Sequence, residues 1–402
     1  MNVLMVLSSP GFPPDIRVEK QATSLSEDGV HVHLLVRRGR NELSKEQVGS
    51  IVVHRVWTPF RRVKAIGDLL YFSLYRYILG FRIVAVARRA RADLLHVHDL
   101  PLALPTLLAG RRIGIPVIFD MHEHYTAMVR GELDGSFVLP FARPLLGLLS
   151  AEERFVCRRA DAILVVAEEH RERIANMGVA PNRVHVVLNA VDIQNIDRII
   201  ETTPGKAPMQ DRRPFRVCYV GGIDECRGID TLLAGLAILQ ARGVTFSATI
   251  VGDGATGVVE KLQVRAMRLG IREDVTLTGW LPFEQAVGHM LRSTICVLPY
   301  HDTPHTRSGI PHKLFQYLAC GKPVLVGSVP SHRRVVCGNI AGISFRSGDP
   351  EQLADRLEWA QAHPEELAIM GRNARNIAEE RFSWAEAADV LRGVYSTIGD
   401  AL

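Results

Sequence analysis

The stretch Cys296–Ser328, CVLPYHDTPHTRSGIPHKLFQYLACGKPVLVGS, decides how we expect the chain to fold. It begins with a short apolar run that ends at Pro299, and it finishes with a second apolar run, Val324–Val326. Between them a polar loop leads into a predicted helix, His312–Ala319, which Gly321 follows as a typical helix stop. The pattern is that of a strand–loop–helix–strand unit, the repeating element of an α/β fold.

The loop before this helix gathers positive charge beside exposed backbone N–H groups. Residues 309–314 span the start of the predicted helix, where the first N–H groups lack partners within the helix and attract phosphate. Arg307, His312 and Lys313 add side-chain charge there. An ordinary α/β crossover with a solvated basic loop has the same pattern, so the pattern alone leaves both interpretations open.

The string PHKLFQYLACGKPVLV, Pro311–Val326, resembles the donor-binding segment of glycosyltransferase family 4, whose members are retaining enzymes with the GT-B fold. The usual family form has a Lys-Leu-Phe-Glu-Tyr-Met-Ala core followed by Gly-Lys-Pro-Val-Val. The resemblance extends from Val3 to about Gly371 through four segments in the same order. It implies an α/β protein with two Rossmann-like domains whose parallel sheets face a central cleft.

Length and composition agree with a large soluble enzyme. A chain of 402 residues exceeds what one ordinary hydrophobic core supports, which predicts two or three domains. With 47% hydrophobic and 23% charged residues, it differs from disordered and fibrous proteins. The net charge of +5 is modest, and we expect no nucleic-acid partner.

Several features favour a cytoplasmic protein. The six cysteines include no C-x-x-C pair, which is typical of a reducing compartment. The first seven residues lack a basic leader, and no run of about 18 uncharged apolar residues could span a bilayer. Basic residues gather in Arg61–Arg91. They indicate either a peripheral contact with the inner face of the cell membrane or a domain helix with a solvated basic face.

The rhythm of apolar runs predicts the domain organisation. It fails between Asn189 and Pro214, where proline, glycine, threonine and charged residues are typical of a linker. We predict an N-terminal Rossmann-like domain over residues 1–192 and a C-terminal one over residues 193–380. The resemblance implies that the first binds the acceptor, that the second binds the nucleotide sugar, and that a last helix, residues 381–402, crosses back to the first.

A glycine pair follows the first predicted strand of the second half. Gly221 and Gly222 would let the backbone approach a diphosphate closely, and Arg227 could bind the same oxygens. An ordinary strand–helix turn explains the same pattern. In the family, two cations of this segment hold the donor diphosphate. Aligned on the glycines, Arg227 takes the position of the second cation, whereas Gly222 replaces the first.

Two further turns resemble family segments near the nucleotide. Gly252 and Gly254 end a predicted strand in the manner of the family's Val-Gly-x-Gly turn, although a plain strand-end turn is an equal alternative. Gly279 precedes Trp280 in a loop that in the family lies beside the nucleobase. Trp280 could stack on the base, or it could be a packed aromatic residue.

The family's donor segment carries two glutamates separated by seven residues, and this chain has neither. Gln316 takes the second position, which binds the ribose hydroxyls in family members, a contact that an amide can also make. Ser308 takes the first position, which contacts the transferring sugar, and it is a poorer substitute. The segment also supplies four predicted donor-binding residues: Arg307, Gly309, Lys313 and Leu314.

In the first half, His122 follows a predicted strand at its C-terminal end, where ligands bind in open α/β sheets. The resemblance gives it the role of the family's histidine that faces the donor sugar and the acceptor. A histidine at the start of a helix without any catalytic role is the alternative. We list His122, Arg227 and Ser308 as candidate catalytic residues.

The histidines near these strands also allow a metal-hydrolase interpretation. His96 and His98 lie on the same face of one strand. The sequence lacks the H-E-x-x-H motif, and it lacks the Asp-x-Asp pair of metal-dependent glycosyltransferases. We therefore expect no metal and no other cofactor.

The first loop, residues 8–15, resembles the loop that closes the acceptor side of the family's site. Gly11 would supply a close backbone contact, and Arg17 on the following helix would contact the acceptor, unless it is an ordinary surface residue.

Together these features predict a retaining glycosyltransferase. The resemblance implies a UDP- or GDP-sugar donor and a glycan, a lipid-linked molecule or a small molecule as acceptor. A catalytically weak sugar-nucleotide-binding subunit is the main alternative because Gly222 and Ser308 lack the expected charge. A UDP-sugar epimerase of the same fold would need carboxylates facing the sugar, and the losses at Ser308 and Gln316 count against it.

Overall fold

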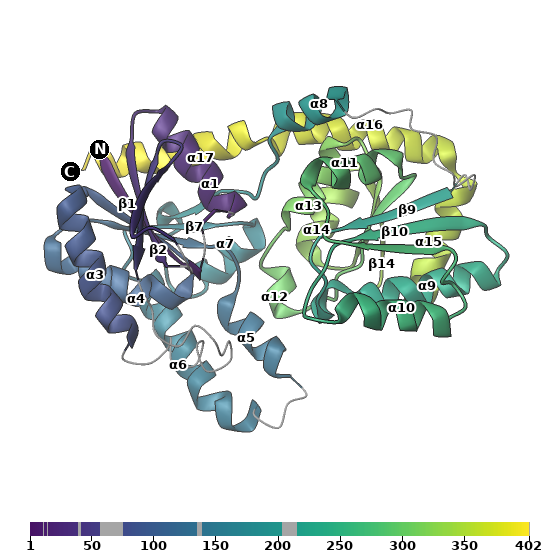
Figure 1. Ribbon diagram of the computed structural model, residues 1–402, viewed down its shortest axis with the longest axis horizontal. Helices are drawn as coiled ribbons and strands as arrows, with labels where there is room; N and C mark the ends of the chain where they lie inside the picture. Colours follow the sequence, from purple (N-terminus) through teal and green to yellow (C-terminus); the bar gives the residue numbers. More distant parts are fainter. Residues whose placement is uncertain are drawn as a thin grey trace. The chain divides into compact units, whose positions relative to one another are not determined.

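The computed structural model describes residues 1–10, 12–13, 15–38, 42–56, 75–134, 139–202 and 215–401. The chain divides into two compact units. Unit 1 comprises Met1–Val187 together with Ala387–Leu402, and unit 2 comprises Leu188–Glu386. Each unit has its own sheet with helices packed against it (Figure 1).

Unit 1 contains an eight-stranded sheet with the order β3-β4-β2-β1-β5-β6-β7-β8. Every strand pair is parallel except β3 and β4, which are antiparallel. The strands are β1 (Asn2–Pro10), β2 (His31–Arg37), β3 (Lys45–Val48), β4 (Ile51–Val56), β5 (Leu94–His98), β6 (Val117–Met121), β7 (Ala162–Val165) and β8 (Val184–Val186). The helices are α1 (Ile16–Glu27), α3 (Tyr75–Ala90), η1 (Leu100–Leu102), α4 (Ala103–Ile113), α5 (Tyr125–Leu133), α6 (Leu139–Cys157), α7 (Glu168–Ala175) and η2 (Pro181–Arg183).

Unit 2 contains a six-stranded, wholly parallel sheet with the order β11-β10-β9-β12-β13-β14. Its strands are β9 (Phe215–Val220), β10 (Phe246–Val251), β11 (Val275–Gly279), β12 (Ile295–Leu298), β13 (Val324–Gly327) and β14 (Gly342–Phe345). Its helices are α8 (Ile193–Thr202), η3 (Glu225–Arg227), α9 (Ile229–Ala241), α10 (Val258–Arg268), α11 (Phe283–Arg292), α12 (Pro304–Arg307), α13 (His312–Ala319), α14 (Pro330–Val336), η4 (Cys337–Asn339), α15 (Pro350–Ala362) and α16 (Pro364–Arg381).

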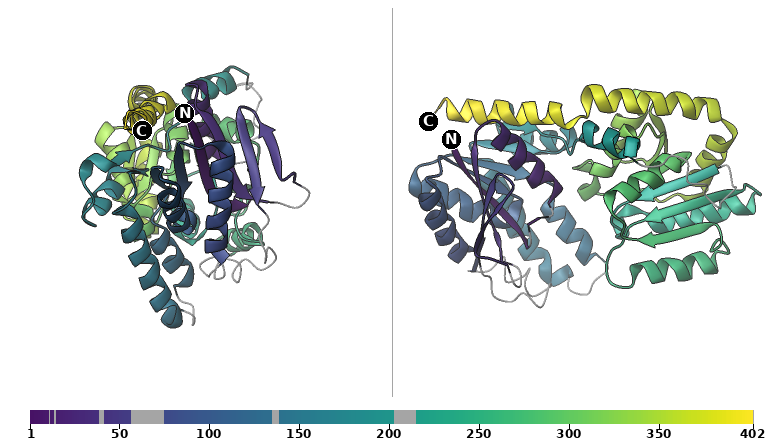
Figure 2. Two further views of the ribbon diagram at one scale, coloured as in Figure 1. Left: turned by 90° about the vertical axis from the view of Figure 1, so that its left-hand side faces the viewer. Right: turned by 45° about the horizontal axis from the view of Figure 1, so that its top comes forward.

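The sequence pattern explains why these sheets are parallel. All residues of β5, β6 and β7 are buried, as are those of β12 and β13. Strands with apolar side chains on both faces need a helical layer on each side, which βαβ crossovers supply. In unit 1, α3 and α4 pack beside each other, and so do α5 and α6 (Figures 1 and 2).

The last helix, α17 (Trp384–Gly399), contains the boundary between the two units. Its N-terminal N–H, on Trp384, donates to the carbonyl of Val191 in unit 2. Further along, the Tyr395 hydroxyl lies 2.6 Å from Nδ1 of His96 in unit 1. Its buried face includes Leu391 and Val394, so the helix is held by packing as well as by these bonds.

Most predicted elements of the sheets are present, and the differences occur mainly at helix ends. The predicted helix 256–269 is α10, which begins at Val258, and the predicted helix 102–111 is α4, which ends at Ile113. The predicted helix 67–91 corresponds to α3 from Tyr75 onward, and its first part lies outside the described residues. The sequence did not indicate the short antiparallel strand β3 or the helices α5, α6, α7, α11 and α14. Part of the stretch that we predicted as linker is also helical, because α8 covers Ile193–Thr202.

Candidate active site

In unit 2 the candidate site begins at the glycine turn after β9. Gly221 has a φ of 127°, and a Cβ built on it would lie 2.2 Å from Nζ of Lys313. Glycine is favoured here because L side chains rarely adopt a φ of 127°, and the end of the Lys313 side chain lies against the same position. A Cβ on Gly222 would meet open space, and the Gly222 carbonyl accepts a hydrogen bond of 2.6 Å from the hydroxyl of Tyr219.

Lys313 lies in the first turn of α13 and is only 7% exposed. Its Nζ donates to the Tyr219 hydroxyl at 2.7 Å and lies 4.2 Å from the centre of that ring. Burial, followed by the nearby charge of Arg227, lowers the pKa of Lys313 well below its ordinary value. Within the described part of the chain no carboxylate forms an ion pair with Lys313, so an arriving anion would stabilise its charged form.

Arg227 approaches the same place from η3. Its Nε donates to Asp224 at 2.8 Å, and its Nη1 donates to the hydroxyl of Tyr300. The guanidinium carbon lies 5.0 Å from the centre of the Tyr300 ring, and Nζ of Lys313 lies 5.5 Å from that centre. The two cations thus converge on one aromatic side chain.

The turns after β9, β10 and β11 are joined through their glycines. The Gly252 N–H donates to Gly279 at 2.8 Å, and a Cβ on Gly252 would lie 2.0 Å from the Gly221 carbonyl oxygen. Gly254 pairs with Ile223 in an isolated bridge. The predicted nucleotide-side glycines therefore form one contiguous group at the C-terminal ends of three neighbouring strands.

Trp280, directly after β11, is 73% exposed. The structure thus excludes the interpretation of Trp280 as a packed aromatic residue. Its ring is available to stack on a planar ligand beside the glycine turns.

In the loop before α13, two of the predicted site residues, Ser308 and Arg307, already have partners within the loop. Ser308 is 4% exposed, and its Oγ donates to the Pro304 carbonyl at 3.1 Å. Arg307 is exposed and forms a bidentate ion pair with Asp302, at 2.6 and 2.9 Å. Both side chains are therefore already engaged within their own loop.

The remaining predicted donor-binding residues, Leu314, Gln316 and Gly309, lie on or just before α13 and differ in exposure and contacts. The Leu314 side chain is completely buried, and its N–H donates to the Pro311 carbonyl at 3.0 Å, so the side chain belongs to the core and is not placed for a donor contact. Gln316 is half-buried and lies three residues beyond Lys313, on the same side of the helix. The Gly309 carbonyl accepts a bond of 3.0 Å from the hydroxyl of Ser331.

In unit 1 a buried network surrounds Asp120 at the end of β6. Arg17 donates to both carboxylate oxygens, at 2.9 and 2.7 Å, and Gln21 donates to one of them at 2.8 Å. Arg17 also donates to the Val187 carbonyl at 2.8 Å and is only 3% exposed. The sequence suggested that Arg17 contacts the acceptor or is an ordinary surface residue. Both predictions are wrong, because the Arg17 side chain is buried and is paired with Asp120. Gly11 lies outside the described residues.

His122 is the part of this network that reaches the surface, with 19% of its side chain exposed. Its Nε2 lies 3.4 Å from Asp120 and 3.1 Å from Nδ1 of His98, and its Nδ1 lies 3.3 Å from Asp99. Burial alone would lower its pKa, but the carboxylates of Asp99 and Asp120 raise the pKa of His122 to about 9. His122 is therefore an imidazolium at neutral pH and donates hydrogen bonds.

His96, His98 and Asp120 bring three potential metal-ligand atoms within 4.8 Å of one another. The Asp120 carboxylate already accepts from Arg17 and Gln21, and the charge of Arg17 holds its pKa well below the ordinary value although burial opposes this. A cation bound here would lie beside the Arg17 guanidinium and would compete with it for the same carboxylate.

Several residues that build the site were not singled out in the sequence. Tyr219 and Tyr300, which hold the two cations, lie within motifs whose glycine, lysine and arginine drew attention first. Asp120 lies two residues before His122 and could have been suggested by that position, whereas Gln21 gives no signal in the sequence.

Two units with parallel sheets, one of which carries glycine turns beside the buried Lys313 and the partly exposed Arg227, are typical of a nucleotide-binding transferase. Comparisons with known proteins identify the family. Residues 14–190 match the family model of the glycosyl transferase 4-like domain, and residues 206–377 match that of glycosyl transferases group 1. The chain belongs to the group 1 glycosyltransferases, enzymes with the GT-B fold that transfer sugar from nucleotide donors.

The relatives of the chain agree with this assignment. It is 25% identical over 394 residues to a D-inositol 3-phosphate glycosyltransferase of Thermobispora bispora, covering 95% of this chain and 89% of that protein. It is 26% identical over 305 residues to the alpha-D-kanosaminyltransferase of Streptomyces kanamyceticus, covering 73% of each.

The solved structures show the same fold at lower sequence identity. Sucrose-phosphate synthase from Thermosynechococcus elongatus superposes with a TM-score of 0.79 at 17% identity, covering 99% of this chain and all of that chain. Anabaena HepE in complex with UDP superposes with a TM-score of 0.72 at 15% identity, with the same coverage. Among the described residues of our chain, no helix is both long enough and apolar enough to cross a membrane.

Proposed function

We propose that this protein is a retaining glycosyltransferase that uses a UDP- or GDP-sugar donor and transfers the sugar to a glycan, a lipid-linked molecule or a small-molecule acceptor. The observation that carries the proposal is the pairing of Lys313 and Arg227 at Tyr300, beside the glycine turn of residues 221–222. This is a compact cationic site next to closely approachable backbone, which suits the diphosphate of a sugar nucleotide.

The two cations act on the charge that develops as the glycosidic bond to the donor breaks. Negative charge then grows on the leaving diphosphate, and donors already in place stabilise it without further rearrangement. Lys313 lacks a carboxylate partner among the described residues and has a lowered pKa, so binding of the diphosphate would return it to the charged form. This arrangement supplies from side chains the charge that a divalent cation would otherwise supply, and we propose transfer without a metal or other cofactor.

His122 contributes a positive charge at the surface of the buried Asp120 network. With a pKa raised to about 9 by Asp99 and Asp120 against the effect of burial, it is protonated at neutral pH and is a poor base. In a retaining reaction the leaving diphosphate itself can take the proton of the acceptor hydroxyl, so no protein base is needed. The two ring nitrogens of His122 already lie 3.3 Å from Asp99 and 3.4 Å from Asp120, so His122 would act on the transferring sugar through its positive charge.

We further propose the following roles for the two units and for their surroundings. Unit 2 binds the donor and unit 1 the acceptor, following the family pattern. The six cysteines are free thiols, which favours a reducing compartment such as the cytoplasm. Nothing in the charge or the site favours a nucleic-acid partner.

The first test is a thermal-shift screen against UDP, GDP, dTDP and their sugar conjugates. A ligand at 100 times its Kd should stabilise the folded state by about 2.7 kcal/mol. A shift with one nucleotide class would identify the donor base, and slow hydrolysis of that donor would then demonstrate chemistry. The absence of any shift at millimolar ligand would contradict the proposal.

A sugar-nucleotide-binding subunit without transfer activity is the second candidate, and two observations favour it. Gly222 offers no side chain, and the Ser308 hydroxyl is bonded to Pro304 within its own loop. Such a subunit would show the nucleotide-dependent shift but would not hydrolyse or transfer the donor sugar.

A further inference from the structure

Helix α6 carries an exposed apolar stripe that the proposed chemistry does not use. Phe141, Leu148 and Phe155 recur every seven residues, which is close to two helical turns, so they lie on one face of the helix. Their exposed fractions are 81%, 68% and 36%. Large apolar side chains aligned and exposed in this way are typical of a surface that contacts a partner or a membrane.

Arginines lie on another part of the exposed surface of the same helix and just beyond its end. Arg143 and Arg154 are exposed and lie 11 residues, or three turns, apart, so they share one face, about 100–160° around the helix from the apolar stripe. Arg158 is exposed just beyond the end of α6, and its Nε donates to the Met177 carbonyl at 2.9 Å. The guanidinium of Arg159 lies 4.1 Å from the centre of the Phe155 ring. We call the exposed residues of 140–159 the α6 surface.

The acidic residues of α6 are turned inward. Glu152 accepts two hydrogen bonds from Arg76, one of them at 2.8 Å. Glu153 is 1% exposed and pairs with Arg173 at 2.6 Å. Every exposed charged residue of the α6 surface is therefore an arginine. The exposed carboxylates of the neighbouring helix region, Glu132 and Asp134, lie at the C-terminal end of α5.

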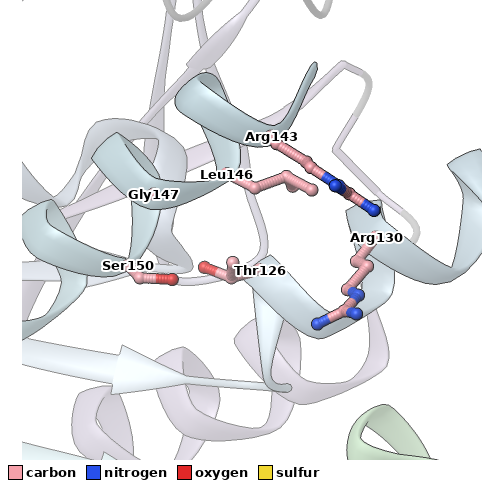
Figure 3. A pocket seen from close by; sticks show the side chains of 6 residues that line it. All are labelled: Thr126, Arg130, Arg143, Leu146, Gly147 and Ser150. Carbon is pink, nitrogen blue, oxygen red and sulfur yellow. The ribbon is translucent and has the colours of Figure 1, made fainter. Parts of the chain in front are cut away.

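The α6 surface is hollowed between the arginines. One pocket, of about 360 Å³, is lined by Thr126, Arg130, Arg143, Leu146, Gly147 and Ser150 (Figure 3). A second, of about 450 Å³, shares Gly147 and Ser150 and extends to Arg154 on the helix and to Arg158 and Arg159 just beyond it. Among the described residues neither pocket is lined by a carboxylate, so both combine positive charge, hydroxyl groups and apolar side chains.

We propose that the α6 surface docks this protein onto an anionic lipid bilayer. An interfacial helix of this kind places aromatic and aliphatic side chains among the acyl chains while its arginines contact the lipid phosphates. The pocket of Figure 3 and the second pocket beside it would receive lipid headgroups. The inference concerns where the protein acts and stands independently of the proposed sugar transfer.

The charge pattern favours a bilayer over the other occupants. A symmetric dimer through α6 would bring the arginines of two copies together, which is unfavourable. A nucleic acid would use the arginines but would leave the Phe141–Leu148–Phe155 stripe in water. A bilayer with anionic headgroups offers acyl chains to the apolar residues and phosphates to the arginines.

The test is co-sedimentation of the full-length protein with vesicles of phosphatidylcholine, alone or with about one-third phosphatidylglycerol. We expect binding to the anionic vesicles only, and we expect it to weaken at high salt because salt screens surface charge. Since each arginine near such a surface contributes about fivefold to partitioning, Arg143→Gln/Arg154→Gln should reduce partitioning about 25-fold. Phe141→Ser/Leu148→Ser should reduce it more than tenfold.

Matched controls lie on α10 of unit 2. Arg265→Gln/Arg268→Gln removes the same charge, and Met267→Ser removes an apolar side chain that is 61% exposed. Both should leave partitioning within about twofold of the parent. The thermal shift of each α6 variant with nucleotide, measured without vesicles, should match that of the parent, which separates this proposal from the proposed function.

Five outcomes would overturn the proposal, four of them for the α6 surface itself. These are no binding to anionic vesicles, equal binding to neutral ones, an equal loss in the α10 controls, or a dimer in sedimentation velocity that Phe141→Ser/Leu148→Ser dissolves. A loss confined to Phe81→Ser would also overturn it, because Phe81 is 66% exposed on α3, in the basic segment 61–91, where the sequence first suggested a membrane contact.

Discussion

Two buried ionisable groups, one in each unit, have opposite surroundings. Asp120 in unit 1 has a full set of partners: the Arg17 guanidinium, the Gln21 amide and two imidazoles. Lys313 in unit 2 has one hydrogen-bond acceptor among the described side chains, the neutral Tyr219 hydroxyl. Burial pushes the pKa of both groups toward the uncharged form, but only at Asp120 do neighbouring charges reverse the effect and hold the pKa well below its ordinary value.

This difference indicates that Asp120 has a structural role and that Lys313 has a ligand-binding role. A charge that is fully compensated within the protein contributes to a rigid arrangement and needs no ligand. A buried cation without a counter-charge lowers stability by itself and gains when an anion binds. We therefore expect substitutions around Asp120 to change stability first, and substitutions around Lys313 to change ligand binding and turnover first.

The largest effect should come from Asp120→Ala. It leaves the buried Arg17 without its carboxylate, which costs about 3–5 kcal/mol of unfolding free energy. Urea denaturation with the exposed Asp355→Asn as control measures the loss, and we expect the control to change by less than about 0.5 kcal/mol.

A double variant sharpens this prediction. Asp120→Leu/Arg17→Met removes both charges and fills similar volume, so it should be less destabilised than Asp120→Ala. If the double variant were the less stable of the two, the ion pair would not be the source of the stability.

The second-largest effect that we expect is a loss of catalytic activity in Arg227→Ala. Arg227→Ala removes a donor from the proposed diphosphate site and should reduce kcat/KM about 100- to 1,000-fold, the usual loss for one electrostatic group acting on developing charge. Stability should change little because the guanidinium is partly exposed. Arg265→Ala on α10 is the matched control, and steady-state transfer or donor hydrolysis is the assay. Parental activity in Arg227→Ala would remove Arg227 from its role.

The pH dependence of stability tests the carboxylate network around His122. Its pKa in the folded state, about 9, exceeds the ordinary value of 6.5, so protonated His122 stabilises the fold. This contribution is complete below about pH 6.5 and is lost as the pH rises through about 9, and its size is of the order of 3 kcal/mol at most.

Comparing the parent with His122→Asn in urea at several pH values isolates the effect. The parent should be the more stable protein at about pH 6, and the difference should shrink toward about pH 10. A constant difference across this range would mean that His122 does not gain a proton on folding.

The sequence predicted the parts of the molecule that depend on local pattern. The buried strands and the glycine turns at 221, 252 and 279 follow from short apolar runs and from the residues that break them. That the Lys313 side chain lies against Gly221 could not be predicted, because the two residues are far apart in sequence.

Long-range pairing explains the main errors at the site. Arg17 lies 103 residues from Asp120, and nothing in the local sequence around either residue indicates a buried ion pair. Helix α6 was missed for a different reason. Its interior contains Pro144, which ordinarily ends a helix, and its apolar residues lie on an exposed face as well as a buried one, so the usual core pattern is absent.

The smallest effect should come from Ser308→Ala, which tests whether this loop acts on the sugar. The Ser308 hydroxyl donates to the Pro304 carbonyl, so its loss should cost about 1 kcal/mol of stability through one hydrogen bond. Because the hydroxyl is already engaged there and the side chain is buried, donor hydrolysis and KM should remain within about twofold of the parent. A selective fall in kcat without a loss of stability would show that the Ser308 hydroxyl leaves Pro304 to contact the sugar. Ser308 would then resemble Lys313, whose side chain gains a partner only when a ligand binds.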